Sequence, residues 1–154
     1  MGHLAEIGSQ PGTRPAISVA AADRARIVLA VVLIALAPDG RAAPATLARV
    51  VQVCRGAPVL AGLGPAAIEE LAGLTLRALA ARGPDRVLAD LRGLTTRPLA
   101  ETALALAVRA AFDGGRVAPD TAGILGGLGT HLGLSAAWLS DLLDVLGALE
   151  RPFG

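Results

Sequence analysis

The sequence predicts an all-α protein, a compact bundle of about seven helices in two pseudo-repeated halves. Hydrophobic residues make up 53% of the 154 residues but aromatic residues only 2%, so the core must be built from Ala, Leu and Val. Ala and Leu have high helix propensities, whereas the strand-favouring aromatic residues are scarce. Pro and Gly also punctuate the chain in the order expected of helix starts and helix ends. A chain of this length fits a single domain.

The N-terminal segment differs from the rest of the chain. Its first 20 residues have no sustained helical period and are interrupted by three glycines and two prolines. We therefore expect a flexible N-terminal arm over residues 1–20 and a single helical domain over residues 21–150.

The first predicted helix, Ala21–Ala37, contains the longest apolar run of the chain, from Ile27 to Ala37. This run is about half of the ~20 residues that a membrane span requires, so we expect a buried helix. Asp23 precedes the run, and Pro-Asp-Gly follows it in place of a signal-peptidase site. We therefore expect no transmembrane segment and no signal peptide. The expected location is cytoplasmic, either free or peripheral to a membrane complex.

The other helices are expected from the residues at their ends, because Pro favours the first turn of a helix and Gly its C-terminal cap. The predicted segments are Pro44–Cys54, Pro65–Arg82, Pro84–Arg92, Pro98–Phe112, Pro119–Leu132 and Ser135–Leu149, with an additional short turn at Pro58–Leu63. Gly83 and Gly133 stand where left-handed C-caps belong, and Ser135 is a natural N-cap.

An internal repeat connects the two most apolar helices to their successors. Residues 39–46 (DGRAAPAT) and 114–121 (GGRVAPDT) share Gly, Arg, Ala, Pro and Thr at a constant offset of 75 positions. We therefore expect two helix–turn–helix units related by duplication, with the apolar helices Ala21–Ala37 and Pro98–Phe112 at the centre of the bundle.

The predicted helix Pro119–Leu132 contains four glycines, each of which costs about 1 kcal/mol relative to Ala. Gly123 and Gly127 are one turn apart, so a second backbone can approach closely there. We expect this neighbour to be another helix of the bundle, the alternative being a helix of a partner. A phosphate-binding loop is disfavoured, since the stretch contains no Lys and follows no predicted strand.

The two connecting segments resemble those of the TerB-like (tellurite resistance) superfamily. The family pattern is an apolar helix ending in Ala-Asp-Gly, a Pro followed by acidic residues that opens the next helix, and a closing Gly-Leu-Ser. The matching stretches are Val31–Val51 and Leu104–Ser135. The resemblance implies an all-helical bundle of about seven helices without catalysis of its own. Such bundles occur as stand-alone bacterial stress-response proteins and as domains attached to membrane-associated partners.

Some members of this superfamily bind a divalent metal through acidic residues in these turns, which here implies Asp39, Asp113 and Asp120. The match is incomplete: Ala45-Thr46 replaces the acidic pair of the first turn, and Gly114 occupies the Asp position of the second. Hard cations need several oxygen ligands that converge on one point. The alternative is that these aspartates serve only as turn and cap residues.

Catalytic patterns are absent from the sequence. His3 lies in the predicted arm, His131 lies near a helix end, and neither forms a recognisable motif with Cys54. Cys54 lies in an apolar stretch, where we expect a small buried hydrophobic residue rather than a nucleophile. We therefore expect no enzyme and no cofactor apart from the divalent cation considered above.

The charge pattern disfavours nucleic-acid binding. The net charge is +1, and the 14 basic residues are all Arg and are spread along the chain. Five of them lie close together in the middle, where Asp85 and Asp90 interleave with them as on a solvated helix face. These five are Arg77, Arg82, Arg86, Arg92 and Arg97.

The last predicted helix carries the expected partner-binding surface. Asp141 and Asp144 are three residues apart and share a face, which is either a solvated helix face or, as the most acidic patch of the chain, a docking surface for a basic partner. Trp138 near the helix start is the only Trp of the chain. We expect Trp138 to be half-buried, with its indole N–H bonded to an acceptor. These features and the arm predict a non-catalytic interaction or adaptor subunit whose protein partner belongs to a membrane-associated or stress-response complex. The alternative is a divalent-metal-binding tellurite or stress-resistance protein.

Overall fold

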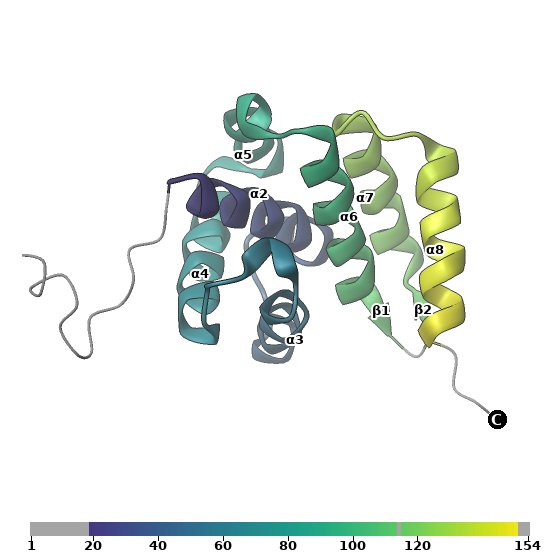
Figure 1. The fold of residues 1–154 in the computed structure, drawn as a ribbon, viewed down its shortest axis with the longest axis horizontal. Helices are drawn as coiled ribbons and strands as arrows, with labels where there is room; N and C mark the ends of the chain where they lie inside the picture. The colour runs from purple at the N-terminus through teal and green to yellow at the C-terminus, as the bar shows by residue number, and fades with distance from the viewer. Residues whose placement is uncertain (1–18, 114, 151–154) are drawn as a thin grey trace, which may run out of the picture.

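The computed structural model describes residues 19–113 and 115–150, and in them the chain is all-α (Figure 1). The predicted arm over residues 1–20 lies outside the described residues except for its last two, which begin the first helix. The described helices are α2 (Val19–Leu36), α3 (Pro44–Arg55), α4 (Pro65–Arg82), α5 (Pro84–Leu91), α6 (Arg97–Ala111), α7 (Pro119–His131) and α8 (Ala136–Glu150). Short 3-10 turns lie at η1 (Pro58–Leu60) and η2 (Arg92–Leu94).

The observed helix ends agree with the predicted ends to within two residues. Agreement is closest where Pro occupies the first helical position, because its missing N–H would have no partner there anyway. In α6 the helix begins one residue before Pro98, since Thr96 acts as the N-cap and its Oγ1 accepts the Leu99 N–H at 3.4 Å. Thr96 was not predicted in this role.

Helix α2 forms the centre of the bundle. Every residue from Ile27 to Ala35 is buried. Because nine consecutive residues cover all sides of a helix, α2 has no solvent face over this stretch. Its most extensive contact is with α6, followed by α4, and Figure 1 shows α2 running between these two helices. The prediction that the two apolar helices form the centre is confirmed, and no helix in the described part of the chain is long and apolar enough to cross a membrane.

The two turns of the predicted repeat share one backbone feature and differ in another. Gly40 and Gly115 both have a positive φ, of 80° and 83° respectively, which Gly adopts without strain. After α6, however, β1 (Phe112–Asp113) and β2 (Arg116–Val117) form a two-residue antiparallel ladder around the turn. The first turn instead packs its glycine against α4. Descent of the two halves from one duplicated unit stays a prediction.

The predicted caps are observed at two of three places. Ser135 Oγ accepts the Trp138 N–H at 3.0 Å, and Gly133, with φ 76°, lets the Leu134 N–H reach the Gly129 carbonyl at 2.8 Å. Gly83 also has a positive φ, but its ψ of 162° is extended rather than left-handed helical. The prediction of a left-handed cap at Gly83 is therefore wrong, because this one residue must redirect the chain from the end of α4 into the start of α5.

The expected close approach of another helix of the bundle at Gly123 and Gly127 is also wrong. A methyl group added at Gly123, Gly126 or Gly127 would meet no neighbouring atom within 4 Å. Gly123 and Gly127 are exposed. Only Gly129 faces the core, where an added methyl group would lie 3.6 Å from Leu104 Cδ2. No described part of the bundle therefore covers α7 at Gly123 and Gly127.

Candidate functional site

A pocket lies where the end of α5, the start of α6 and the end of α7 meet over α2. Its volume is about 240 Å³. Its floor is apolar and consists of Ile27, Val31, Leu88, Leu91, Ala100 and Leu132. Its rim is polar and carries Arg92, Thr95, Thr96, Arg97 and His131. An apolar floor with a few polar groups at one end is the usual construction of a small-molecule site.

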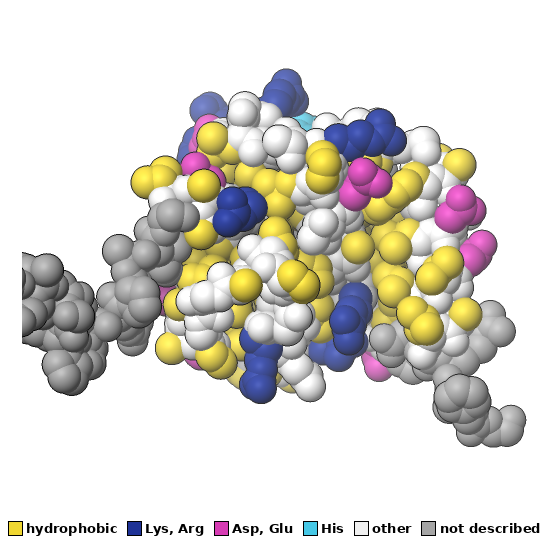
Figure 2. All heavy atoms as spheres, in the orientation of Figure 1, with side chains coloured by type: hydrophobic (Ala, Val, Ile, Leu, Met, Phe, Trp, Pro, Cys, Tyr) yellow, Lys and Arg dark blue, Asp and Glu magenta, His cyan; other side chains and the backbone are white. Residues whose placement is uncertain are grey.

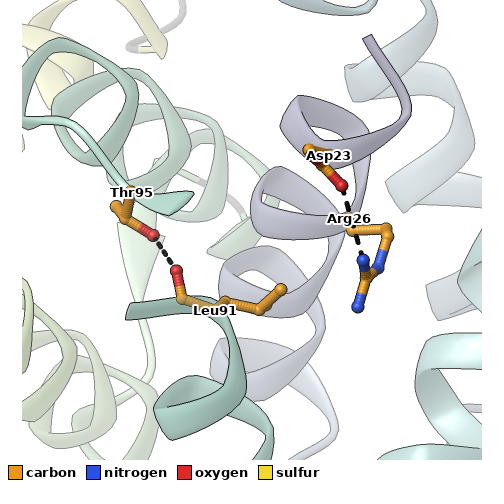
Figure 3. A network of polar contacts seen from close by, with 4 residues as sticks. All are labelled: Asp23, Arg26, Leu91 and Thr95. Atoms are coloured by element: carbon orange, nitrogen blue, oxygen red, sulfur yellow. Dashed lines mark hydrogen bonds and ion pairs between the residues drawn. The ribbon is translucent and has the colours of Figure 1, made fainter. Parts of the chain in front are cut away.

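The connection between α5 and α6 forms one wall of this pocket. Thr95 Oγ1 donates a hydrogen bond to the Leu91 carbonyl at 2.8 Å, and the Leu91 side chain points toward α2 (Figure 3). Thr96 next to it caps α6, as described above. These two threonines satisfy backbone groups at the end of one helix and the start of the next. The short connection that they stabilise places Arg92 and Arg97 on the rim of the pocket.

The rim of the pocket is electropositive. It carries two arginines, and no carboxylate is among the residues that line the pocket. Arg97 Nε lies 3.8 Å from Glu101 Oε1, an exposed contact of little strength. Arg92 forms no ion pair with any described residue. Basic side chains also gather along the upper edge of the molecule in Figure 2, above α5 and the start of α6.

The predicted partner-binding residues lie on α8, at the edge of the bundle (Figure 1). Trp138 is half-buried as predicted, and Asp141 and Asp144 are exposed. The expected acceptor for the Trp138 indole N–H is not found among the described residues, where only its backbone N–H is bonded, to Ser135. Two large hydrophobic side chains of the same helix that were not predicted as binding residues, Val145 and Leu149, are 58% and 75% exposed.

The three aspartates of the metal hypothesis are all exposed and have local roles. Asp39 Oδ1 accepts the Arg41 N–H at 3.0 Å within its own turn. Asp113 lies opposite Arg116 in the short ladder, and Asp120 lies in the first turn of α7, where a negative charge complements the helix dipole. Among the described residues, no group of three or more His, Cys, Asp or Glu side chains is placed to hold a metal ion.

Cys54 is a buried residue of α3, as predicted. Burial raises the pKa of its thiol to about 11, because the apolar surroundings disfavour the thiolate. Since the thiolate is the reactive form, this cysteine is not a nucleophile in the folded protein at neutral pH.

The sequence does not reveal the pocket, because its arginines fit the pattern of a solvated helix face. One part of that prediction holds, since Arg82 pairs with Asp90. Arg92 and Arg97 are also exposed, and in addition they border the pocket. The available signal was the segment LRGLTTR at residues 91–97, which combines two arginines and two hydroxyl groups with no acidic residue.

No family model, curated protein or solved structure matches the chain. The resemblance to the TerB-like superfamily therefore stays a prediction.

Proposed function

We propose that the chain is a non-catalytic interaction module that binds a basic amphipathic segment of a protein partner on the outer face of α8. The observation that carries this proposal is a row of apolar side chains on one helix face, beside two carboxylates that form no ion pair with a described residue. We call this set, Trp138, Asp141, Asp144, Val145 and Leu149, the α8 face.

The apolar row follows from the helical period. Val145 and Leu149 lie seven and eleven residues after Trp138, and at 3.6 residues per turn all three share one side of α8. Burying the exposed parts of Val145 and Leu149 stabilises a complex by about 1–2 kcal/mol each. Trp138 contributes a rigid, half-buried aromatic surface of the kind that anchors protein interfaces.

The charges next to this row favour a basic partner. Neither Asp141 nor Asp144 forms an ion pair with a described residue, and the sequence of α8 contains no Lys or Arg. Figure 2 shows acidic and hydrophobic side chains side by side over α8. An acidic face repels an anionic bilayer but attracts the basic segments that flank membrane-spanning helices. A partner within a membrane-associated complex therefore suits this face.

The proposal is tested by affinity capture from the native host with the full-length chain, followed by titration of the captured partner's basic segment as a peptide. We expect one stoichiometric partner, and quenching or a spectral shift of Trp138 fluorescence on peptide binding. The double substitution Asp141→Arg/Asp144→Arg should weaken peptide binding at least ten-fold. Its matched control is Glu69→Arg/Glu70→Arg, which reverses two exposed charges on α4.

Equal binding by the α8 variant and the wild type would refute the proposal, as would a partner that lacks a basic segment. A second experiment addresses the metal-binding alternative. A dose-dependent rise in the unfolding temperature with Ca²⁺ or Mg²⁺ that Asp39→Asn abolishes would favour that function instead, because a ligand specific for the folded state raises its stability.

A further inference from the structure

We propose that the pocket between α5, α6 and α7 binds a small organic monoanion, specifically a carboxylate with a short alkyl chain. This proposal is independent of the α8 face, which lies on another part of the bundle. The proposal is based on the size of the pocket, its apolar floor and the charges of its rim.

The volume limits the ligand to a small molecule. The pocket holds about 240 Å³, whereas a buried cavity of about 150 Å³ accommodates benzene and typical sites for drug-sized ligands and cofactors occupy about 300–1,000 Å³. A ligand of about ten non-hydrogen atoms fits this range. Nucleotides and common coenzymes are larger than the pocket.

The apolar floor of the pocket favours a ligand with a hydrocarbon chain. Ile27, Val31 and Ala100 are buried residues of the two central helices, and Leu88 and Leu91 close the floor from α5. None of these five side chains can donate or accept a hydrogen bond. An alkyl chain on this floor removes apolar surface from water without leaving a polar group unsatisfied.

The rim of the pocket favours a ligand with a negatively charged group. The guanidinium groups of Arg92 and Arg97 can each bind a carboxylate through two parallel hydrogen bonds. Thr96 uses its oxygen to accept the Leu99 N–H, so its hydroxyl hydrogen remains free to donate to an anion. The same residue marks the N-terminus of α6, a helix of 15 residues whose positive dipole end lies at the rim.

One feature on the rim and one residue next to it oppose an anion, and neither outweighs the arginines. The C-terminal end of α7 brings a negative dipole end, but the carbonyls of Leu128, Gly129 and Thr130 already accept N–H groups of the following turn. Glu101 lies near Arg97 at 3.8 Å. Two arginines and one neighbouring glutamate leave one net positive charge, which suits a monoanion better than a dianion.

The test is a titration of the full-length protein with three probes of equal chain length, octanoate, octan-1-ol and octylammonium, followed by amide NMR shifts. We expect saturable one-to-one binding of octanoate with shifts at the pocket residues, binding of octan-1-ol at least ten-fold weaker, and no binding of octylammonium. Arg92→Gln and Arg97→Gln should each weaken octanoate binding about ten-fold and leave octan-1-ol unchanged. Arg86→Gln, an exposed arginine of α5 that does not line the pocket, is the matched control and should have no effect.

A second pair of variants tests the floor. Ala100→Leu should fill the pocket and abolish octanoate binding, and Leu132→Phe at a half-buried position should do the same if the Ala100 variant fails to fold. Equal affinity for the three probes would overturn the proposal. Shifts outside the pocket, or equal weakening by the Arg86 control, would overturn it as well.

Discussion

Cys54 links the burial of a single side chain to a pH dependence of stability. The pKa of its thiol is about 11 in the folded protein against 9.0 for an unperturbed thiol, so the unfolded chain loses this proton first as the pH rises. The stabilisation is fully present below pH 9 and is lost as the pH rises from about 9 to about 11. Its size is on the order of 3 kcal/mol, since one pKa unit corresponds to about 1.4 kcal/mol.

The measurement is urea denaturation at several pH values between 8 and 11, for the wild type and for Cys54→Ala. The alanine variant is less stable at pH 8 because it loses buried volume. We expect the difference between the two proteins to shrink toward pH 11. Rapid reaction of the folded wild type with a thiol reagent at pH 8 would contradict the assigned burial.

Gly40 and Gly127 are predicted to respond in opposite directions to the same substitution. A methyl group at Gly40 would lie 2.5 Å from the Leu76 carbonyl oxygen and from the Ala80 nitrogen, and its φ of 80° is strained for Ala. We expect Gly40→Ala to lower the free energy of unfolding by at least about 2 kcal/mol. Gly127→Ala meets no neighbouring atom and should raise it by about 0.5–1 kcal/mol, because Ala loses less backbone entropy.

Chemical denaturation of the two variants checks this pair. Loss of stability in Gly127→Ala would mean that another surface covers α7 at this place. A neutral Gly40→Ala would mean that the first turn does not pack against α4.

At the scale of elements, α8 is the least anchored helix of the described structure. Leu139 is its only buried residue between Ala136 and Leu149, and its principal contacts are with α6 and α7. Elements with few buried apolar contacts open locally at a lower free energy than the core. We expect the amide hydrogens of α8 to exchange through such local opening, and those of α2 to exchange only on global unfolding.

Hydrogen exchange measured by mass spectrometry distinguishes local opening of α8 from unfolding of the whole protein. Adding a partner peptide that binds the α8 face should slow exchange in α8 and leave α2 unchanged. Equal protection of both helices in the free protein would show that α8 unfolds together with the core.

At the scale of the whole molecule, stability depends on a central helix that is buried on all sides. Leu33 of α2 has no solvent exposure, whereas Leu74 on α4 is 50% exposed. We expect Leu33→Ala to cost about 2–5 kcal/mol of unfolding free energy through lost burial and a residual cavity. Leu74→Ala should cost no more than about 1 kcal/mol.

Urea unfolding of both variants measures the contrast. Because every other helix packs directly or indirectly against α2, the Leu33 variant should keep a single cooperative transition at a lower midpoint. Equal costs for the two substitutions would contradict the central position of α2.

The sequence by itself determined the fold class, the helix ends and the burial of α2. Helix ends depend on local chemistry: a Pro at the first position, a Ser at an N-cap and a Gly with a positive φ act within a few residues of chain. The run from Ile27 to Ala35 is apolar on all sides of a helix, so its burial follows without knowledge of its neighbours.

The tertiary structure alone decided which surfaces are covered and which remain open. Gly123 and Gly127 face solvent because no described helix packs on that side of α7, which the glycine spacing cannot reveal. The pocket joins Ile27 with His131, residues more than a hundred positions apart. In the sequence, Arg92 and Arg97 cannot be distinguished from arginines on a solvated helix face. The physical reason is that dihedral preferences and caps act locally, whereas a surface or pocket exists only through the packing of elements distant in the chain.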